Sequence, residues 1–351
     1  VLKASYLWDL IITNAWKTGD PGVIFLNTIN KSNPTPKLGS ISATNPCGEV
    51  PLLPYESCNL GSINLSHMIT NKSNKNTIDW LKLEKTIRIA IRFLDNVITV
   101  NHYILTENET ITKKNRKIGL GVMGWAEMLM KLHIPYASEK AINLAEKLMK
   151  FTHDISYDES NILAKEKGEF LEYKNSIHDK PIRNATCNSI APTGTISVIA
   201  NTSYSIEPLF ALAFKRSGIL NNTTQVEIND VFVKEMKRLG LWNKEVKEHI
   251  LNSGSIQQIN SMPSQLKEIY KTSLEIPWIY HLKHQKVFQK YTDNAVSKTI
   301  NLPKNTSVQE ISKIYETAWK YNLKGITIYR YGSKDKQILQ HCNYNSLKEC
   351  L

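Results

Sequence analysis

Hydrophobic residues recur at helical spacing over long parts of this chain. In Asp79–His102 they form a broad apolar surface, which predicts a largely buried helix. Further helices are predicted over residues 2–16, 138–167 (with Gly168 as the cap), 279–291 and 307–321, and charged peripheral helices within 225–268.

Short apolar runs between these segments predict strands. They cover residues 23–26 (after a turn at 19–22), 57–65, 183–192, 295–302 and 325–329, while 32–44 and 71–76 have loop composition. Strands that alternate with helices predict an α/β fold with a mostly parallel sheet.

A glycine motif, Gly119–Gly124, fits the G-x-G-x-x-G pattern of dinucleotide-binding loops. That reading requires an apolar strand before the motif. The preceding residues, 113–117, are mostly Lys, Arg and Asn. We therefore interpret the glycines as sites of close strand–helix packing.

The side chains best suited to catalysis are those of Asn45, Cys47 and Glu49, which are separated by Pro46 and Gly48. Proline and glycine disfavour a helix and favour an extended or looped backbone. An extended backbone would place the amide, thiol and carboxylate on one face. A lone cysteine is usually a small core residue, but two polar neighbours on its face are costly in a core unless they are used. Cys58, eleven residues after Cys47, adds a second thiol that can supply electrons by forming a disulfide.

A second candidate site is the sequence Thr193-Gly194-Thr195-Ile196-Ser197 at a predicted strand-to-helix turn. Backbone N–H groups and a helix dipole at such a turn can hold a phosphate. An ordinary Ser/Thr-rich helix cap has the same composition, so the residues alone leave both interpretations open.

Composition narrows the classes of function. The 351 residues carry a net charge of +12. They contain no block of five Lys or Arg, so a nucleic-acid partner is weakly supported. No apolar run approaches 18 residues and no signal peptide precedes the first elements, so we expect no membrane span. Five cysteines without scaffold spacing favour a reducing cytoplasm. The start at Val1, directly before a helical pattern, suggests a piece of a longer protein.

We expect no metal site. Cys342 and Cys350 have poor spacing for zinc, and no second ligand pair follows them. His133 and His341 are interpreted as ordinary polar residues, and Cys187 as a core residue.

The span Asn45–Leu65 closely resembles the catalytic finger loop of ribonucleotide reductases, most of all the adenosylcobalamin-dependent (class II) branch. Residues 191–197, followed by Ile206-Glu207-Pro208, are similar to the loop that holds the substrate diphosphate. Residues 115–136 resemble a barrel strand and helix of the family. The resemblance covers residues 20–339.

This resemblance implies an α/β fold that is the second half of a ten-stranded barrel, with a central finger loop at residues 43–58. The partial barrel domain would cover residues 1–339, followed by a tail at 340–351. The first half, which supplies the partner of Cys58 and the specificity-effector site in the family, would be missing. A tail cysteine pair relays electrons in the family, and Cys342 and Cys350 are candidates for its remnant.

The implied function is reduction of ribonucleotides, expected as diphosphates, to 2′-deoxyribonucleotides for DNA synthesis. Cys47 would be the thiyl-radical site, Asn45 and Glu49 its substrate-binding and acid/base partners, and Cys58 half of the reducing pair. The implied phosphate ligands are Thr193, Gly194, Thr195, Ile196 and Ser197. The implied cofactor is adenosylcobalamin, and the implied partners are a dithiol reductant such as thioredoxin and a separate N-terminal half-barrel chain.

Three alternatives remain open. The chain can belong to a class I large subunit, which receives its radical from a separate protein, although the Pro-Cys-Gly context favours class II. It can be an inactive nucleotide-binding fragment of a split reductase. A basic nucleic-acid binder is the least supported.

Overall fold

The structure is a computed structural model that describes residues 2–73, 75–219, 223–334 and 339–340. The sequence predictions for His341, Cys342, Cys350 and most of the 340–351 tail therefore lie outside the described residues. The boundary at residue 339 stays a prediction.

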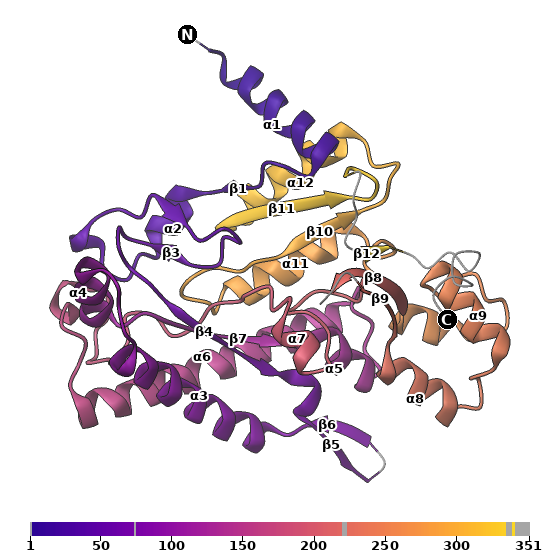
Figure 1. The fold of residues 1–351 in the computed structure, drawn as a ribbon, viewed down its shortest axis with the longest axis horizontal. Helices are drawn as coiled ribbons and strands as arrows, with labels where there is room; N and C mark the ends of the chain where they lie inside the picture. Colours follow the sequence, from indigo (N-terminus) through magenta and orange to yellow (C-terminus); the bar gives the residue numbers. More distant parts are fainter. Residues whose placement is uncertain (1, 74, 220–222, 335–338, 341–351) are drawn as a thin grey trace.

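A run of parallel segments crosses the centre of the molecule (Figure 1). β4 (Asn59–Asn64) pairs with β7 (Ile118–Met123), and β10 (Thr299–Leu302) pairs with β11 (Gly325–Arg330). Single parallel bridges, Leu120–Asn188 and Ile190–Val296, connect the two pairs through residues 188–190. The order is therefore β4, β7, residues 188–190, residues 296–302 and β11, an open half of a barrel. β1 (Val23–Ile24) adds an antiparallel edge to β11.

The strand expected over 183–192 is only partly present, because its pairing is limited to these bridges. The cause is the carboxylate of Asp293, which accepts backbone N–H groups that would otherwise be available for strand pairing. Asp293 Oδ2 accepts the N–H groups of Cys187 at 2.7 Å and Asn188 at 3.0 Å. The predicted strand 295–302 is likewise shortened to β10.

Long helices cover the sheet, and capping residues define their ends. α3 (Trp80–Val100) begins after Asp79, whose Oδ1 accepts the N–H of Lys82 at 3.0 Å. α6 (Glu139–Lys167) lies between Ser138 and the cap Gly168. These two helices pack against each other and bury the largest hydrophobic cluster together with β4 and β7. α11 (Trp278–Gln289) packs on α6, and α12 (Val308–Lys320) packs with α1 (Ala4–Thr18) over a second cluster.

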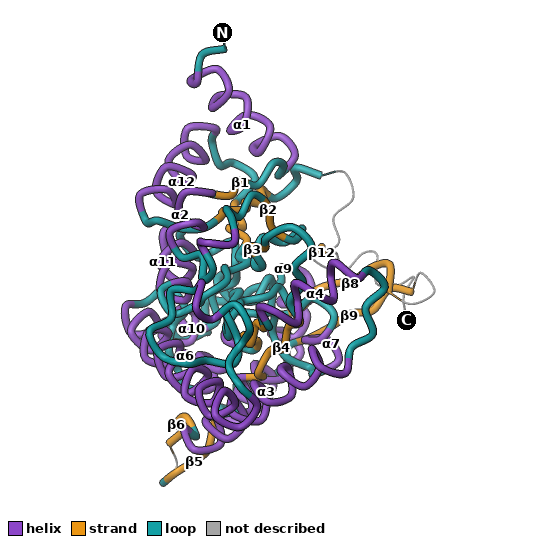
Figure 2. Tube along the Cα trace, turned by 90° about the vertical axis from the view of Figure 1, so that its left-hand side faces the viewer, coloured by secondary structure: helices purple, strands orange, loops and turns teal. Residues whose placement is uncertain are grey.

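The remaining helices and strands, drawn in purple and orange in Figure 2, complete the fold. They are α2 (Leu26–Lys31), η1 (Pro36–Leu38), β2 (Ala43–Thr44), β3 (Pro51–Leu52), η2 (Leu65–His67), β5 (Ile69–Lys72), β6 (Lys75–Ile78), α4 (Thr106–Asn115), α5 (Trp125–Lys131), η3 (Tyr173–Asn175), α7 (Ile196–Ile199), β8 (Ala213–Ile219), β9 (Thr223–Ile228), α8 (Asp230–Arg238), α9 (Lys244–Ser253), α10 (Ser264–Ile269) and β12 (Leu339–Gln340).

Three sequence predictions are wrong in detail. The loop expected at 71–76 lies within the β5–β6 hairpin. The strand expected at 23–26 ends at Ile24, because Leu26 already begins α2. The start of the helical region expected at 225–268 belongs to β9, which pairs with β8.

The glycine motif is a site of close packing, as expected, but the packing is between neighbouring strand segments and not between a strand and a helix. Gly119 and Gly121 lie inside the buried strand β7. A Cβ on Gly121 would lie 2.2 Å from the carbonyl oxygen of Ser189, and one on Gly119 would lie 2.5 Å from a methyl group of Leu60. Residues 188–190 can therefore pack closely alongside β7 only because these positions carry no side chain.

Within the described residues, no helix is both long enough and apolar enough to cross a membrane.

Candidate active site

The finger loop is a tight antiparallel hairpin. β2 pairs with β3, and the N–H of Asn45 donates to the carbonyl of Val50 at 3.2 Å. At the tip, the N–H of Gly48 donates to the carbonyl of Asn45 at 3.0 Å, and Gly48 has φ 83°. Asn, Pro and Gly at these positions match the preferences of a type I turn. The looped backbone is therefore correct and the extended one is wrong.

The turn separates side chains that an extended backbone would align. Cys47 is exposed at the tip, whereas Glu49 is only 3% exposed. Cys47 faces a cavity of about 270 Å³ between β1, β11 and residues 296–298. The side-chain carbonyl of Asn45 accepts the N–H of Val50 at 3.0 Å, so it stabilises the turn. The amide NH₂ of Asn45 donates to no described residue and is free to meet a ligand.

Glu49 anchors the finger to the sheet through its backbone. Its carbonyl accepts the N–H of Ala295 and the hydroxyl of Ser189, both at 2.9 Å. One carboxylate oxygen, Oε2, is buried without a hydrogen-bond partner among the described residues. A buried, unpaired carboxylate oxygen is costly, so it is a candidate acceptor for a substrate hydroxyl.

The two thiols share an electrostatic environment with Glu49. Partial burial, followed by the Glu49 charge, raises the pKa of Cys47. Burial also raises the pKa of the Cys58 thiol to about 12; Lys117 opposes this shift, and Glu56 and Glu49 add to it. Both groups are therefore neutral S–H groups near pH 7. This form suits donors of a hydrogen atom, whereas nucleophilic cysteines need the thiolate.

A buried ion pair that the sequence reasoning missed holds the base of the finger. Lys117 Nζ lies 2.6 Å from Glu56 Oε2, and each side chain is 1% exposed. The same oxygen accepts the N–H of Leu53 at 2.6 Å. Glu56 lies inside the finger sequence, but nothing in the sequence indicates its partner.

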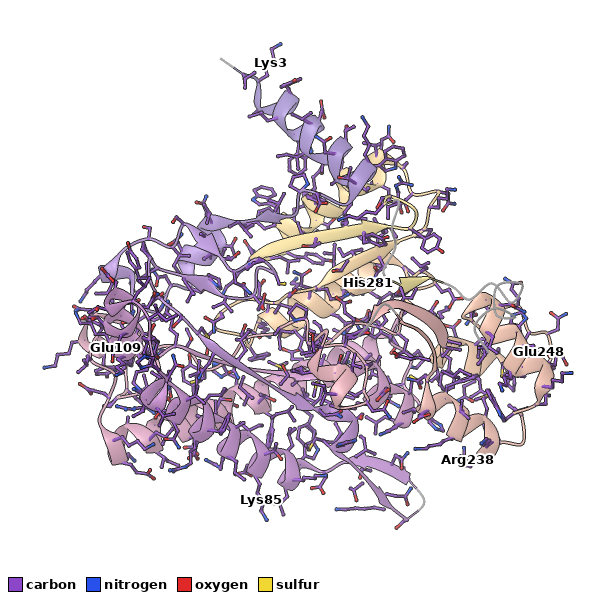
Figure 3. All side chains as sticks on the ribbon, viewed as in Figure 1. Lys3, Lys85, Glu109, Arg238, Glu248 and His281 are labelled. Carbon is purple, nitrogen blue, oxygen red and sulfur yellow. The ribbon has the colours of Figure 1, made fainter. Side chains whose placement is uncertain are left out.

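A second missed group is Lys298, which lines the Cys47 cavity. Its buried ammonium pairs with Glu207 and donates to Nδ1 of His281 at 3.0 Å. Burial lowers the pKa of Lys298, and Glu207 opposes that shift. Figure 3 shows His281 in the interior, whereas Lys85, Glu109, Arg238 and Glu248 lie at the periphery. A lysine within the predicted strand 295–302 was the available signal for this site.

The loop 193–197 has the form of an open cradle. Thr193 has φ 56°, and its hydroxyl oxygen accepts the N–H of Ser205 at 2.8 Å. The N–H groups of Gly194, Thr195 and Ile196 donate to no described residue, and a Cβ on Gly194 would meet no atom within 4 Å. The Ser197 hydroxyl is buried without a described partner.

Two expectations about this loop need revision. The helix that follows, α7, has only four residues, so its dipole contributes little to anion binding. The alternative of a Ser/Thr helix cap is not supported, because the side chain of Thr195 makes no capping hydrogen bond. The unpaired N–H groups are the observation that still favours binding of an anion at this loop.

The other histidine and cysteine predictions concern structural residues. Cys187 is fully buried in the main hydrophobic cluster, as expected. His133 lies with Nε2 3.1 Å from Glu235 Oε1, in a polar surface contact.

Comparison with known proteins identifies the family of this chain. Residues 1–182 and 172–329 match the family described as ribonucleotide reductase, barrel domain. The chain belongs to this family. The expected fold, half of a ribonucleotide reductase α/β barrel with a finger loop, is thereby confirmed.

The names of similar proteins agree with this assignment. The chain is 45% identical over 341 residues to a vitamin B12-dependent ribonucleoside-diphosphate reductase of Thermoplasma acidophilum, covering 96% of this chain and 44% of the relative. It is 44% identical to the protein of the same name from Mycobacterium tuberculosis, covering 97% and 48%. The class Id ribonucleotide reductase alpha subunit of Actinobacillus ureae superposes with a TM-score of 0.79 at 26% identity, covering 93% of this chain and 61% of that structure. This ribonucleotide reductase chain thus spans about half the length of the B12-dependent relatives.

Proposed function

We propose that this chain forms part of an enzyme that reduces ribonucleoside diphosphates to 2′-deoxyribonucleotides for DNA synthesis. The proposal rests on the arrangement of side chains at the tip of the finger loop. It places an exposed Cys47 at a cavity, with a buried carboxylate oxygen of Glu49 nearby that lacks a partner. The names of the B12-dependent relatives support diphosphates as substrates.

The proposed roles follow from the positions of the side chains. The Cys47 thiyl takes the hydrogen atom from C3′ of the ribose. Glu49 accepts the proton of the 3′-hydroxyl through Oε2, as a positioned carboxylate can. The free NH₂ of Asn45 holds a ribose hydroxyl. The 2′-hydroxyl leaves as water, and two thiols supply the two electrons and become a disulfide.

The diphosphate is proposed to lie against residues 193–197. The N–H groups of Gly194, Thr195 and Ile196 would donate to its oxygens, supported by the Ser197 hydroxyl. The pair formed by Glu207 and Lys298 then connects this loop to the Cys47 cavity, because Glu207 follows the loop and Lys298 lines the cavity.

We propose adenosylcobalamin as the cofactor, on the strength of the B12-dependent relatives. When bound, it supplies the radical that converts a cysteine into a thiyl. The residues fit this chemistry, because the Cys47 sulfur is exposed and remains a neutral thiol. The exposed Cys47 would be the thiol that the cofactor's radical reaches, whereas Glu49, which is 3% exposed, is shielded from solvent.

Cys58 requires a partner that the described part of the chain does not supply. Cys47, Cys58 and Cys187 are all free thiols, and Cys187 is buried in the hydrophobic cluster. We propose that a separate N-terminal half-barrel brings the second thiol, and that a dithiol protein such as thioredoxin reduces the resulting disulfide. Free thiols in all three described cysteines favour the reducing cytoplasm as the site of action.

A turnover assay with a ribonucleoside diphosphate, adenosylcobalamin and dithiothreitol tests this function. We expect deoxyribonucleotide formation when an N-terminal half from a B12-dependent relative is added, and none with the chain alone. Turnover that does not depend on cobalamin but requires a metal-containing radical subunit would instead indicate a class I large subunit. Diphosphate binding without turnover under either condition would indicate an inactive fragment.

A further inference from the structure

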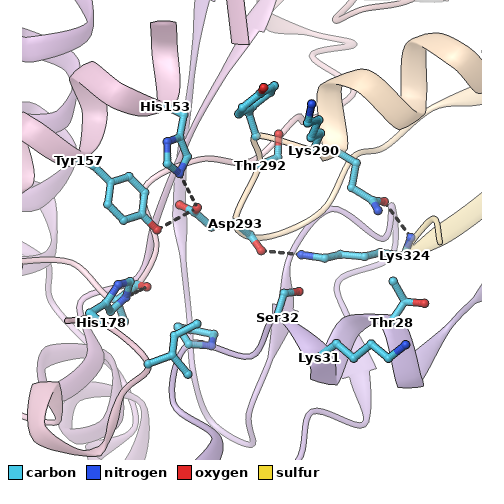
Figure 4. A pocket seen from close by; sticks show the side chains of 15 residues that line it. Thr28, Lys31, Ser32, His153, Tyr157, His178, Lys290, Thr292, Asp293 and Lys324 are labelled. Atoms are coloured by element: carbon cyan, nitrogen blue, oxygen red, sulfur yellow. Dashed lines mark hydrogen bonds and ion pairs between the residues drawn. The ribbon is translucent and has the colours of Figure 1, made fainter. Parts of the chain in front are cut away.

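A second polar cavity, with no part in the proposed reaction, lies at the amino-terminal ends of the parallel segments (Figure 4). Its volume is about 380 Å³. Ala185, Asp293 and Lys324 line it, and each comes shortly before a segment of the sheet. The rest of the wall comes from α2 and the residues just after it, from α6, and from residues 177–178 and 289–292. None of its lining residues lines the Cys47 cavity.

The wall of this cavity contains one carboxylate, that of Asp293, and both of its oxygens already accept hydrogen bonds. Asp293 Oδ2 accepts the N–H groups of Cys187 and Asn188, and Oδ1 accepts the hydroxyl of Tyr157 at 2.9 Å. His153 Nε2 lies 3.8 Å from the same Oδ1. Asp293 therefore holds the sheet and α6 together, and it is not available to bind a cationic ligand.

Lys324 is a buried cation in the same wall. The residue is 6% exposed, and Nζ donates to the backbone carbonyls of Asp293, at 2.6 Å, and Asn294. Among the described residues, no carboxylate oxygen lies within ion-pair distance of this ammonium. Two of its three N–H bonds thus have acceptors, and the third has none among the described residues. Figure 4 shows the side chain reaching into the centre of the cavity. A buried charge without a counter-ion is unfavourable and is stabilised by an anion.

The rim adds positive charge and hydroxyl groups. Lys31 and the hydroxyls of Thr28 and Ser32 come from α2 and its end. Lys290 is held by Glu146 at 2.5 Å. The titratable and charged groups that line the cavity around Lys324 come from four segments. They are Lys31 from α2, His153 and Tyr157 from α6, His178 from the loop after η3, and Lys290, Tyr291 and Asp293 from the end of α11 and the turn after it.

We propose that this cavity binds the phosphate group of a small phosphorylated molecule, with Lys324 and Lys31 as cations and Thr28 as a hydroxyl donor. The volume falls in the range of small-molecule sites, roughly 300–1,000 Å³, and exceeds what inorganic phosphate alone would fill. A second, non-catalytic site of this kind does not depend on the proposed reductase reaction.

The site has a characteristic pH dependence. Burial lowers the pKa of Lys324 to about 8, and the Asp293 charge opposes this shift. A bound anion favours the charged ammonium and so raises that pKa. Affinity should be constant near pH 7, where Lys324 is protonated. It should fall as the pH rises through 8, by up to about tenfold per unit.

The test is calorimetric titration of the 351-residue chain carrying Gly194→Val, so that the loop 193–197 does not contribute. The probes are adenosine 5′-monophosphate, whose second pKa near 6 keeps it a dianion above pH 7.5, and inorganic phosphate. Lys324→Gln keeps a donor for the carbonyl groups and should weaken binding about tenfold or more. Lys31→Ala, at an exposed position, should weaken it about threefold. Lys320→Ala, an exposed lysine on α12, is the control and should change nothing.

Saturable binding of either probe with this dependence supports the site, and the ratio of the two affinities shows whether it takes a phosphorylated nucleoside or free phosphate. The proposal is overturned if neither probe binds. It is also overturned if Lys324→Gln and Lys31→Ala both bind as tightly as the Lys320→Ala control, or if affinity does not fall between pH 7.5 and 9.5.

Discussion

Lys117→Met should destabilise the chain strongly and loosen the finger. Lys117 and Glu56 are each 1% exposed, and their charged atoms lie 2.6 Å apart. Removing the lysine leaves a buried carboxylate whose remaining donors are the N–H of Leu53 and the amide of Asn115. Breaking a buried pair from one side costs roughly 3–5 kcal/mol. This is a large part of the roughly 5–15 kcal/mol that stabilises a typical domain.

Urea unfolding of wild type and variant measures this loss directly. Two further variants make the interpretation specific. Lys113→Met removes a lysine that pairs with Glu109 on the surface of α4, so it should cost little. The double variant Lys117→Met with Glu56→Leu removes both buried charges, so it should regain part of the stability lost by Lys117→Met alone. A loss below about 1 kcal/mol for Lys117→Met, or a double variant less stable than the single one, would refute the reasoning.

Two other predictions concern the proposed chemistry. In a complemented enzyme, Cys58→Ser should still form the initial radical, seen by electron paramagnetic resonance, but should not sustain multiple turnovers with dithiothreitol; normal steady-state turnover would show that Cys58 is structural. Thr195→Val should weaken ribonucleoside diphosphate binding about tenfold to a hundredfold, and Gly194→Val should weaken it more, because its side chain would enter the open space above the loop. Equilibrium binding of the diphosphate and of the free nucleoside checks this prediction, and equal losses for both ligands would contradict it.

Local patterns predicted the long helices well. α3 and α6 combine apolar periodicity with capping residues, so their ends agree with the sequence within about two residues. The β5–β6 hairpin was missed because its strands are mostly polar and contain no buried residue, and therefore lack an alternating pattern. The strand at 183–192 was overestimated because Asp293, more than 100 residues away in sequence, takes its backbone donors.

The candidate site shows the same limit. Asn45, Cys47, Glu49 and Cys58 stand out in the sequence, yet Pro46 and Gly48 form a turn, and the shared face expected for an extended chain is absent. Lys117 and Lys298 were not predicted, because their partners lie 61 and 91 residues away. Only the tertiary fold shows that these lysines are buried beside the finger.

The most direct test of the central claim is deoxyribonucleotide formation by the complemented enzyme with Cys47→Ser. A serine hydroxyl preserves the turn and the approximate size of the side chain, but it does not form a stable radical under the same conditions. We predict a folded protein that binds ribonucleoside diphosphate with wild-type affinity and makes no deoxyribonucleotide in the presence of adenosylcobalamin and dithiothreitol. Measurable product from the serine variant would contradict the assignment of Cys47 as the radical site.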